Sequence, residues 1–575
     1  MKIRLPIGIE SFEEVRTNDC CYIDKTGFIQ ELLEDTFKVN LITRPRRFGK
    51  TLTMSMLADF FSIHKDSKEL FEGLEISHNT ELCKEWRNQW PVLFLTLKDI
   101  DGDTFEDAYN MLQFSISSLC IEHSYLETSE QVSPIERKTF LRLINQEGTQ
   151  TDVKTALVVL IRMMEKHYRK PVILLIDEYD VPLAKANDHG YYPQMLNIMR
   201  TFLGMAWKTN PSLKFAVITG CLRIAKESIF TGANNFVSNS VSTPRYSRYF
   251  GFTEQEVSLL LKTAGLLRQE EKSNILADIR HWYDGYLFGA QEVYCPWDVL
   301  NHVSILMTDP GAVPQSYWKD TSHNQIIRRF IDRKDLFVHD KFEILLSGGI
   351  IQEHIAEDLT YDFDHSSEDN LWSILYLTGY LTQASPKLLP ARFSLEEGKK
   401  ALRIPNEEIR TLFAETVAKW FTDTVTMLER TEFFYAWWNG DAAKLTKEIT
   451  DILFATISYF DYREDYYHAF TAGLFVGAGY EVASNSEKGT GRADILIKDR
   501  KNRRAIVIET KRSRTEASMQ KDCLDALEQI ERRQYAKSLL KGYTTILCYG
   551  AAFFEKQSLL MERNSLISSG RGAST

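Results

Sequence analysis

The 575-residue sequence predicts an α/β protein of several domains, with a mostly parallel sheet in its amino-terminal part. Four apolar runs, each near the start of a helical or polar stretch, indicate βαβ units and therefore parallel strands. A chain of this length is too long for a single hydrophobic core, so three or four domains are expected. The strand candidates are residues 39–42, 92–97, 172–176 and 215–219.

The first apolar run leads into a basic loop and then into a helical pattern at 52–61; the loop reads Arg44-Pro45-Arg46-Arg47-Phe48-Gly49-Lys50-Thr51. A strand, a tight loop and a helix bring backbone N–H groups, a helix N-terminus and an ammonium to one point, where a polyphosphate can sit. Gly49 permits close backbone approach, Lys50 reaches the outer phosphates, and the Thr51 hydroxyl is a candidate Mg²⁺ ligand. We therefore predict a P-loop nucleoside triphosphate site, with ATP and Mg²⁺ as cofactors.

The match to G-x-x-x-x-G-K-[ST] is incomplete, because Arg44 stands at the position of the first glycine. Arg46 and Arg47 add charge that either contacts phosphate or is only solvated. Phe48 completes the set of nucleotide-binding candidates in the loop. The alternative interpretation of the segment is a basic turn between a strand and a helix.

Two further apolar runs end in polar residues, as expected at the ligand-binding edge of an open α/β sheet. The run 172–176 is followed by Asp177, the expected Mg²⁺ partner, and by Glu178, the candidate base that orients the attacking water. Asp180 is better explained as a helix cap. After the run 215–219, Thr219 and Arg223 either sense the terminal phosphate or begin a helix.

The composition is that of an ordinary globular protein, with 44% hydrophobic and 26% charged residues. The net charge of -10 excludes a globally basic nucleic-acid binder, so any such binding must rest on local basic patches. The eight cysteines are scattered without a C-x-x-C pair, which argues against a zinc site and for a reduced protein. Without a signal pattern or a membrane-spanning apolar run, we expect a soluble cytoplasmic chain.

The pattern along the chain changes twice. Residues 123–152 are polar and are expected to form a surface excursion, whereas a capping box from Thr253 to Glu256 opens a helical region. The acidic stretch 353–369 is interpreted as a solvated linker and not as a metal site. The expected domains are 1–252 for the ATPase core, 253–350 for a helical lid, 351–440 for a linker and mixed helical or winged-helix-like region, and 441–575 for a carboxyl-terminal domain.

A second chemical centre is predicted in a carboxyl-terminal β-hairpin. Its strands are 491–497 and 505–511, joined by a polar turn at 498–503. Because alternate residues of a strand share a face, Glu509 and Lys511 point together, and Asp494 can approach Glu509 across the hairpin. Two carboxylates that bind Mg²⁺, with one lysine, suit metal-assisted phosphodiester hydrolysis. The alternative is a surface hairpin with ordinary cross-strand ion pairs.

Between residues 498 and 514, eight Lys or Arg outnumber two acidic residues, a local balance of +6 in an acidic protein. Phosphate backbones are attracted to such a patch. A solvated edge that discourages strand pairing would have the same composition.

With both centres in view, the sequence resembles bacterial AAA-ATPase-like proteins that carry a carboxyl-terminal domain of the PD-(D/E)XK nuclease superfamily. The resemblance covers nearly the whole chain and includes the loop at 44–51, where Arg44 looks like a variant of this family. The other segments that carry it are 5–8, 22–26, 177–180, 249–253, 282–286, 466–468, 491–494 and 509–511. It implies a P-loop NTPase core, a helical middle region and an α/β restriction-endonuclease-like domain.

The resemblance also implies a further acidic residue on an earlier helix of the nuclease domain. Glu464 matches that position best, and Glu487 is a rival. Ala493 replaces the proline of the superfamily name, and Gln529 and Tyr535 resemble the accessory Gln and Tyr of some members.

The leading functional hypothesis is an ATP-hydrolysing protein with a Mg²⁺-dependent nuclease acting on DNA, in defence or mobile-element biology, with no membrane partner. A homo-oligomer is a further expectation, and Arg223, Arg245 and Arg248 are the candidates for an arginine finger. The rival hypothesis is a nucleotide-dependent switch or scaffold whose carboxyl-terminal domain binds nucleic acid or protein without cleavage. A third option is an ATPase acting on protein partners.

Overall fold

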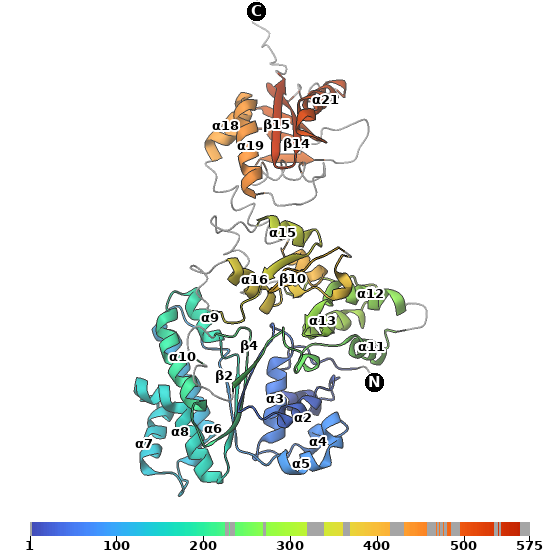
Figure 1. Cartoon of the computed structure of the whole chain (residues 1–575). Coiled ribbons are helices and arrows are strands. Elements are labelled where there is room, and N and C mark those ends of the chain that lie inside the picture. Colours follow the sequence, from blue (N-terminus) through green and yellow to red (C-terminus); the bar gives the residue numbers. More distant parts are fainter. Residues whose placement is uncertain are drawn as a thin grey trace, which may run out of the picture. The chain divides into compact units, whose positions relative to one another are not determined.

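The chain folds into two compact units, one made of residues 1–321 and 350–412, the other of residues 322–349 and 413–575 (Figure 1). Each unit is described by itself below. The computed structural model describes residues 3–224, 229, 236–267, 272–318, 339–359, 368–390, 392–413, 430–456, 467, 471, 475, 480–484, 495–533, 539 and 542–563.

The first unit is built on a five-stranded parallel sheet in the order β2-β3-β4-β1-β5. The four apolar runs are its first four strands, as predicted, and they are almost wholly buried because helices cover both faces. Their carboxyl ends meet at one edge, where Thr43 lies opposite Gly220 and Thr96 lies opposite Asp177. The strands are β1 (Val39–Thr43), β2 (Val92–Thr96), β3 (Val172–Asp177), β4 (Leu213–Gly220) and β5 (Phe236–Asn239).

Helices lie on both sides of this sheet in Figure 1, with α2 to α5 on one side and α6 to α10 on the other. The segment 123–152 was expected as a surface excursion, but it contains α7 and the start of α8, and Phe140 and Leu143 of α7 are buried. The helices are α1 (Phe12–Thr17), α2 (Gly27–Glu34), α3 (Lys50–Phe61), α4 (Lys68–Phe71), α5 (Thr80–Trp86), α6 (Phe105–Glu122), α7 (Pro134–Ile144), α8 (Gln150–Tyr168), α9 (Val181–Asp188) and α10 (Tyr192–Trp207).

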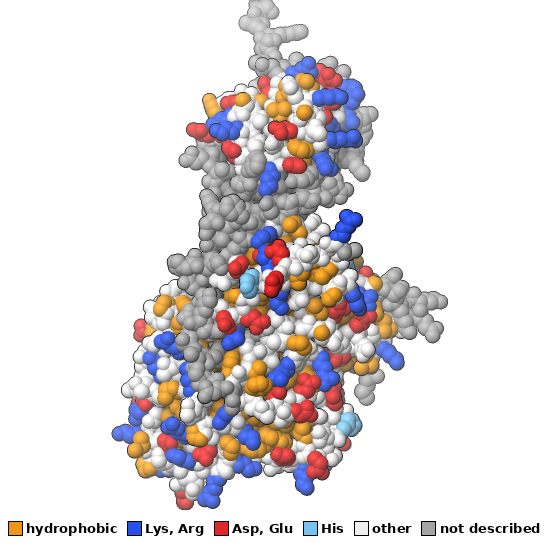
Figure 2. Space-filling view, viewed as in Figure 1, with side chains coloured by type: hydrophobic (Ala, Val, Ile, Leu, Met, Phe, Trp, Pro, Cys, Tyr) orange, Lys and Arg blue, Asp and Glu red, His pale blue; other side chains and the backbone are white. Residues whose placement is uncertain are grey.

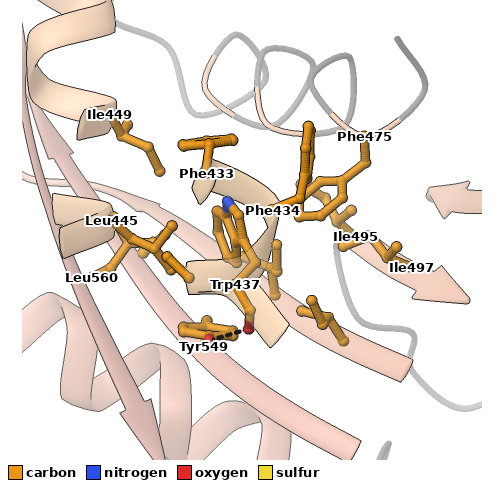
Figure 3. Packing of buried hydrophobic residues seen from close by; sticks show 14 of the residues in the cluster. Phe433, Phe434, Trp437, Leu445, Ile449, Phe475, Ile495, Ile497, Tyr549 and Leu560 are labelled. Atoms are coloured by element: carbon orange, nitrogen blue, oxygen red, sulfur yellow. Dashed lines mark hydrogen bonds between the residues drawn. The ribbon is translucent and has the colours of Figure 1, made fainter. Parts of the chain in front are cut away.

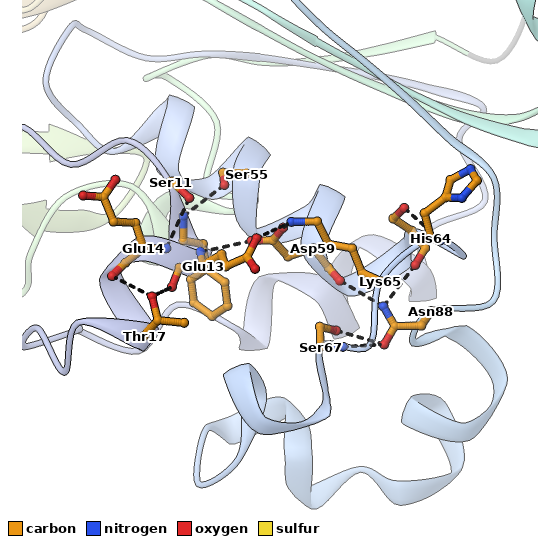
Figure 4. A network of polar contacts seen from close by, with 12 residues as sticks. Ser11, Glu13, Glu14, Thr17, Ser55, Asp59, His64, Lys65, Ser67 and Asn88 are labelled. Atoms are coloured by element: carbon orange, nitrogen blue, oxygen red, sulfur yellow. Dashed lines mark hydrogen bonds and ion pairs between the residues drawn. The ribbon is translucent and has the colours of Figure 1, made fainter. Parts of the chain in front are cut away.

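A polar network fixes the helix that follows the basic loop (Figure 4). The backbone N–H of Phe12 donates to Ser55 Oγ at 3.0 Å, and that of Glu13 donates to Asp59 Oδ2 at 3.1 Å. Lys65 Nζ lies 2.5 Å from Asp59 Oδ1, so the buried carboxylate is paired. Helix α1 is thereby attached to α3, which carries Lys50 and Thr51 at its first turn.

A helical region follows the sheet, and its first helix begins with the predicted capping box of Thr253 and Glu256. Residues 351–359 do not form a solvated linker as expected. They include a strand with a buried Glu353, while Glu357 accepts a hydrogen bond from Ser240. The elements are α11 (Glu254–Thr263), α12 (Lys272–Tyr283), α13 (Pro296–Leu306), α16 (Glu368–Leu377), and strands β6 (Tyr286–Phe288), β7 (Gln291–Val293), β8 (Ile351–His354), β9 (Thr382–Gln383) and β10 (Lys399–Arg403).

The second unit contains a mixed sheet in the order β11-β12-β13-β14-β15. The predicted hairpin is β12 and β13, paired antiparallel, and α21 connects β13 to the parallel strand β14. The described elements are α15 (His339–Leu346), α18 (Arg430–Asn439), α19 (Ala442–Thr456), β11 (Glu481–Ser484), β12 (Ile495–Asp499), β13 (Arg504–Arg512), α21 (Met519–Arg532), β14 (Thr545–Phe554) and β15 (Gln557–Arg563).

Hydrophobic clusters hold helices against both faces of this sheet. On one face, Trp437 of α18 lies under the sheet, and Tyr549 Oη donates to its carbonyl oxygen at 2.6 Å (Figure 3). Ile506 and Ile508 belong to this cluster, whereas Val507 packs with Leu527 of α21 on the opposite face. The alternation of β13 therefore places Glu509 on the same face as Val507, the face that α21 covers.

Within the described ranges, none of the helices has the length and apolarity needed to cross a membrane. The bounds of the four domains given by the sequence remain predictions. The α/β architecture itself, with a parallel sheet in the first unit and a mixed sheet in the second, is confirmed.

Candidate nucleotide and metal sites

The loop between β1 and α3 has the geometry of an anion cradle. Gly49 adopts the left-handed backbone conformation with φ of +80°, and a Cβ built on it meets nothing within 4 Å. Lys50 is 5% exposed, and its Nζ donates to the carbonyl oxygens of Arg44 and Pro45 at 3.0 and 2.9 Å. Thr51 follows in the first turn of α3. The ammonium thus lies inside the loop, at the amino end of a twelve-residue helix.

Asp177 and Thr219 meet at the carboxyl edge of the sheet, from the adjacent strands β3 and β4. Asp177 is fully buried, and its Oδ1 accepts a hydrogen bond from Thr219 Oγ1. Its second oxygen, Oδ2, is buried with no hydrogen-bond partner among the described residues. A buried carboxylate oxygen without a donor is costly unless a ligand or water meets it, so this atom fits a bound Mg²⁺ or its water.

Glu178 directly follows Asp177 and has a left-handed backbone with φ of 53°, which is uncommon for a residue other than glycine. Burial raises the pKa of its carboxyl above the usual range, while Lys50 and Arg46 act in the opposite direction. A carboxyl with a raised pKa, close to the loop cations, is suited to general-base work near neutral pH.

The next residues hold the edge together. Asp180 is the N-cap residue of α9, as predicted, but its side chain does not cap the helix. Its Oδ2 accepts the backbone N–H groups of Cys221 and Leu222, both at 2.9 Å. Tyr179 Oη donates to the carbonyl oxygen of Leu222 at 2.6 Å. These bonds attach the segment after β4 to the segment after β3. The role of Asp180 is therefore structural, as expected, but through other contacts.

Arg223 does not turn toward Asp177. Its Nη1 lies 3.2 Å from Asp358 Oδ1, and its guanidinium lies over the ring of Phe236. The described residues after Gly220 form bends and an isolated bridge, so they do not begin a helix. Of the pair Thr219 and Arg223, the structure brings Thr219 alone to the carboxylate.

The loop arginines have three different positions. Arg44 is fully buried: its Nη1 donates to the carbonyl oxygens of Thr43 and Asn239, and its guanidinium lies over the rings of Phe250 and Phe288. Arg46 lies close enough to influence the charge of Glu178. Arg47 turns to the helical region, where it donates to the carbonyl oxygen of Tyr317.

Phe48 is also part of the packing, since its ring lies 5.0 Å from those of Tyr286 and Phe288. Phe48, one of the loop residues predicted to bind nucleotide, therefore contributes its backbone and not its side chain to the cradle. Arg44, which was treated as a departure from a phosphate motif, acts as a buried anchor of the loop.

Sequence reasoning missed a pair of buried carboxylates beside Arg47. Asp298 and Glu408 are both fully buried, and each pKa is raised by that burial. Glu408 Oε1 accepts the backbone N–H of Trp318 at 3.0 Å, and Asp298 Oδ2 accepts Nε1 of Trp318 at 3.1 Å. The two positions are 110 residues apart in the chain, so no local spacing indicates the pair.

All three arginine-finger candidates have carboxylate partners within the first unit. Arg223 pairs with Asp358, Arg245 Nη1 lies 3.3 Å from an oxygen of Asp35, and Arg248 Nη2 lies 2.9 Å from an oxygen of Glu31. Any of them must leave this partner before it reaches a neighbouring subunit's nucleotide.

In the second unit, the predicted pair Glu509 and Lys511 does share one face of β13. Glu509 is 1% exposed, and Lys511 Nζ lies 3.9 Å from its Oε1. Gln529 Nε2, on α21, donates to the same oxygen of Glu509. A buried carboxylate held by a lysine and an amide donor is of the kind that can ligate a divalent cation, because carboxylate oxygens are its preferred ligands.

Two predicted members of this site, Glu464 and Asp494, lie outside the described residues, as does Tyr535. Asp494 directly precedes β12, whose first residue, Ile495, pairs with Ile508, the neighbour of Glu509. Within the described part of the chain, no cluster of three or more His, Cys, Asp or Glu forms a metal-binding group.

The basic stretch does not form one patch. Lys498 and Arg500 pair with Glu481 at 3.7 and 2.8 Å, and Arg504 pairs with Asp499 at 2.8 Å, all near the hairpin turn. Lys511 and its basic neighbours lie at the other end of β13. In the face shown in Figure 2, Lys and Arg side chains gather along one border of the second unit, whereas acidic and basic side chains are interspersed over the first.

Comparison with known proteins gives a family match for each of the two regions. Residues 6–230 match the family model described as a predicted AAA-ATPase, and residues 462–563 match that of the PD-(D/E)XK nuclease superfamily. A relative from Azotobacter chroococcum mcd 1, described as an uncharacterized protein in the vnfD 5' region, is 25% identical over 509 residues, which are 86% of this chain and 87% of that protein. The chain therefore has the predicted architecture, an amino-terminal domain of the predicted AAA-ATPase family followed by a carboxyl-terminal domain of the PD-(D/E)XK nuclease superfamily.

Proposed function

We propose that the protein binds and hydrolyses ATP in its first unit and carries a Mg²⁺-dependent nuclease, acting on DNA, in its second. The observation that supports this proposal best is the buried Asp177, whose Oδ2 has no partner among the described residues at the edge that also holds Lys50. A buried anionic oxygen and a buried ammonium at the same sheet edge are expected where a cation and phosphates bind.

Each residue of the nucleotide edge has a role in this proposal. Gly49 and the amides at the start of α3 surround the phosphates, and Lys50 exchanges its two loop carbonyls for phosphate oxygens. Thr51 and Asp177 hold Mg²⁺, which supplies charge neutralisation at the phosphates. Thr219 fixes Asp177 through its hydroxyl. Glu178 orients the attacking water and accepts its proton.

In the nuclease half, Asp494 and Glu509 hold the divalent cation, with Glu464 as the further acidic residue. Bound there, the cation supplies a water of lowered pKa. Lys511 stabilises charge on the phosphate that is attacked, and Gln529 fixes the Glu509 carboxylate through its amide.

The test is incubation of the purified chain with plasmid DNA and Mg²⁺, with and without ATP, while phosphate release is followed in parallel. We expect Mg²⁺-dependent cleavage that Lys511→Ala abolishes, and ATP hydrolysis that Lys50→Ala abolishes. Lys68→Ala, at an exposed lysine on α4, is the control for both assays. Cleavage that persists in Lys511→Ala means that the nuclease assignment is wrong.

The alternative function is a nucleotide-dependent switch or scaffold that binds nucleic acid or protein without cutting. One observation favours it: several basic side chains of the hairpin are paired within the domain. A lack of cleavage in every divalent metal, together with an oligomeric state that changes with nucleotide, would decide for this alternative. A homo-oligomer, a cytoplasmic location and a part in defence or mobile-element biology belong to the proposal.

A further inference from the structure

A cavity of about 570 Å³ lies between α8 and α10 of the first unit, away from the nucleotide edge. Three cationic side chains from two elements reach it: Arg162 on α8, Arg200 on α10, and Lys208 just after α10. The other lining residues are Val158, Thr201, Gly204, Met205, Thr209 and Asn210. Neither family match nor the proposed function assigns a role to this cavity.

The helical spacing explains why the hollow forms. Arg200, Gly204 and Lys208 follow one another at intervals of four residues, so they lie along one face of α10. Gly204 has no side chain, and the carbonyl oxygen of Ile229 and the Lys208 side chain both lie over it. A Cβ built on Gly204 would lie 3.7 Å from Lys208 Nζ, which shows that the lysine bends back over the glycine.

No carboxylate in the described part of the chain pairs with the three cations. Among the described residues, Arg162, Arg200 and Lys208 form no ion pair and no side-chain hydrogen bond. Helix α10 contains no Asp or Glu. Helix α8 contains Asp152, which pairs with Arg142, and Glu165, three residues after Arg162. Cations on opposite sides of a hollow repel one another, so an anion that binds between them relieves this repulsion.

A simpler explanation applies to Lys208 alone, since a cation just after a helix favours its C-terminal carbonyls. It does not explain Arg162, which comes from another helix, nor Arg200, two turns earlier on α10. Solvated arginines are ordinary on a convex surface, but these two arginines and the lysine surround one cavity.

The cavity is separate from the nucleotide site. Asn210, one of its lining residues, lies just before the first residue of β4, whereas Thr219 near the end of β4 belongs to the nucleotide edge. With a rise of about 3.3 Å per residue, the strand separates the two by roughly 20 Å. A ligand in the cavity therefore does not compete directly with ATP.

We propose that this cavity, the α8–α10 pocket, binds phosphoryl groups, supplied either by a nucleic-acid backbone or by a free phosphate compound. Arginine matches phosphate oxygens with paired N–H donors, and the two arginines stand at the exposed rim while the lysine lies deeper. The assignment rests on the first unit alone and does not depend on ATP hydrolysis or on cleavage.

The test maps the reaction of phenylglyoxal with individual arginines of the full chain by peptide mass spectrometry. The probes are inorganic phosphate, pyrophosphate and a 30-nucleotide DNA, at matched phosphate concentration. We expect a probe to slow the modification of Arg162 and Arg200 about threefold or more, while Arg392, an exposed arginine of the same unit, reacts at an unchanged rate. Protection by DNA alone identifies a nucleic-acid backbone, and equal protection by pyrophosphate identifies a free phosphate compound.

A matched pair of variants tests whether the three cations form one site. In Lys208→Gln, we expect the probe concentration for half-protection of Arg200 to rise about threefold, and protection by DNA to weaken as salt is raised. Lys154→Gln, which removes a lysine of α8 outside the cavity, should leave this concentration unchanged. The proposal is overturned when no probe protects Arg162 and Arg200 in the unmodified chain.

Discussion

The two candidate sites differ in how much of the fold each one requires. At the nucleotide edge, the ends of three strands and the start of α3 converge, and the side chains of Arg47, Lys50 and Asp180 also bond to backbone groups of the loop and of neighbouring segments. In the nuclease unit, the described part of the site lies on one strand and one helix, where Glu509, Lys511 and Gln529 contact one another. Residues of the first site therefore also stabilise the fold of the first unit, whereas the fold of the second unit is stabilised mainly by hydrophobic clusters outside its site.

This difference has a practical consequence. Substitutions at the nucleotide edge are expected to change stability and activity together, because carbonyl and amide groups of the backbone lose their partners. Substitutions on the polar face of β13 are expected to separate the two, because the hydrophobic clusters on either side of the sheet stay intact. The four predictions below test this contrast.

The largest effects are expected from two isosteric substitutions. Asp177→Asn should lower the rate of ATP hydrolysis about 100-fold or more and leave basal DNA cleavage unchanged, while Glu509→Gln should do the reverse. Both variants keep the size of the side chain. Glu509→Gln should leave calorimetric unfolding close to that of the unmodified chain, whereas Asp177→Asn should also lower the unfolding temperature of the first unit, because the Thr219 hydroxyl loses a charged acceptor. Loss of both activities in either single variant would show that the two sites are coupled.

The second prediction concerns Arg44. Arg44→Gly restores the glycine of the general P-loop pattern, yet it removes three hydrogen bonds and leaves a cavity between Phe250 and Phe288. We expect the first unit to lose about 4 kcal/mol of unfolding free energy, measured by denaturant titration.

The matched substitution is Arg46→Gly, at a half-buried position of the same loop. It should lower the unfolding free energy of the first unit by about 0.5 kcal/mol. A stable Arg44→Gly variant with faster ATP hydrolysis would mean that the residue belongs to the phosphate motif after all.

The third prediction is a pH dependence caused by Asp298 and Glu408. Burial raises the pKa of both carboxyls. Above pH 4.5, the ordinary pKa of a glutamate, the unfolded chain has released a proton that the folded chain keeps, so folding takes up a proton. The stability contribution is complete below that value and is lost as pH rises, by as much as about 1.4 kcal/mol per pH unit. Because burial raises the pKa of Glu408 to about 10, this carboxyl by itself should cost the first unit about 3 kcal/mol between about pH 6 and about pH 8.

Glu408→Gln tests whether stability falls as pH rises for this reason. It removes one titrating group and keeps an oxygen to accept the Trp318 backbone N–H. The groups that face the pair are Arg47, Cys295, Tyr317 and Trp318. We expect a flatter dependence of the unfolding midpoint on pH in this variant. A control, Glu397→Gln, changes an exposed carboxyl of the same unit and should leave the slope as it is.

The sequence predicted those elements whose burial is determined by residues that are close together in the chain. The runs that became β1 to β4 and the run Ala505 to Ile508 of β13 are apolar on both faces, so their burial is visible locally. Arg44 was not predictable in the same way, because its acceptor on Asn239 lies 195 residues away. The acidic stretch after Ile351 was misread for a similar reason, since the partners of its carboxylates come from distant segments.

The smallest of the four effects is expected at Gln529, where the amide donates to the Glu509 carboxylate. Gln529→Leu keeps the size of the side chain and the helix propensity but removes this donor to a buried charge, at a cost of about 2 kcal/mol to the second unit. Because a fixed carboxylate binds a cation better than a loose one, the Mg²⁺ concentration for half-maximal cleavage should rise about tenfold. Gln520→Leu, an exposed position on the same helix, is the control.

The Mg²⁺ titration distinguishes two roles of Gln529, a structural role between α21 and β13 and a positioning role at Glu509. A residue that only holds α21 against β13 would lower the unfolding free energy without changing the Mg²⁺ requirement, and cleavage would recover fully at a temperature where the variant is folded. A residue that positions Glu509 would keep the raised Mg²⁺ requirement under the same conditions. The second result would also limit the contrast between the two units, because the nuclease site would then depend on a hydrogen bond between two elements of its framework.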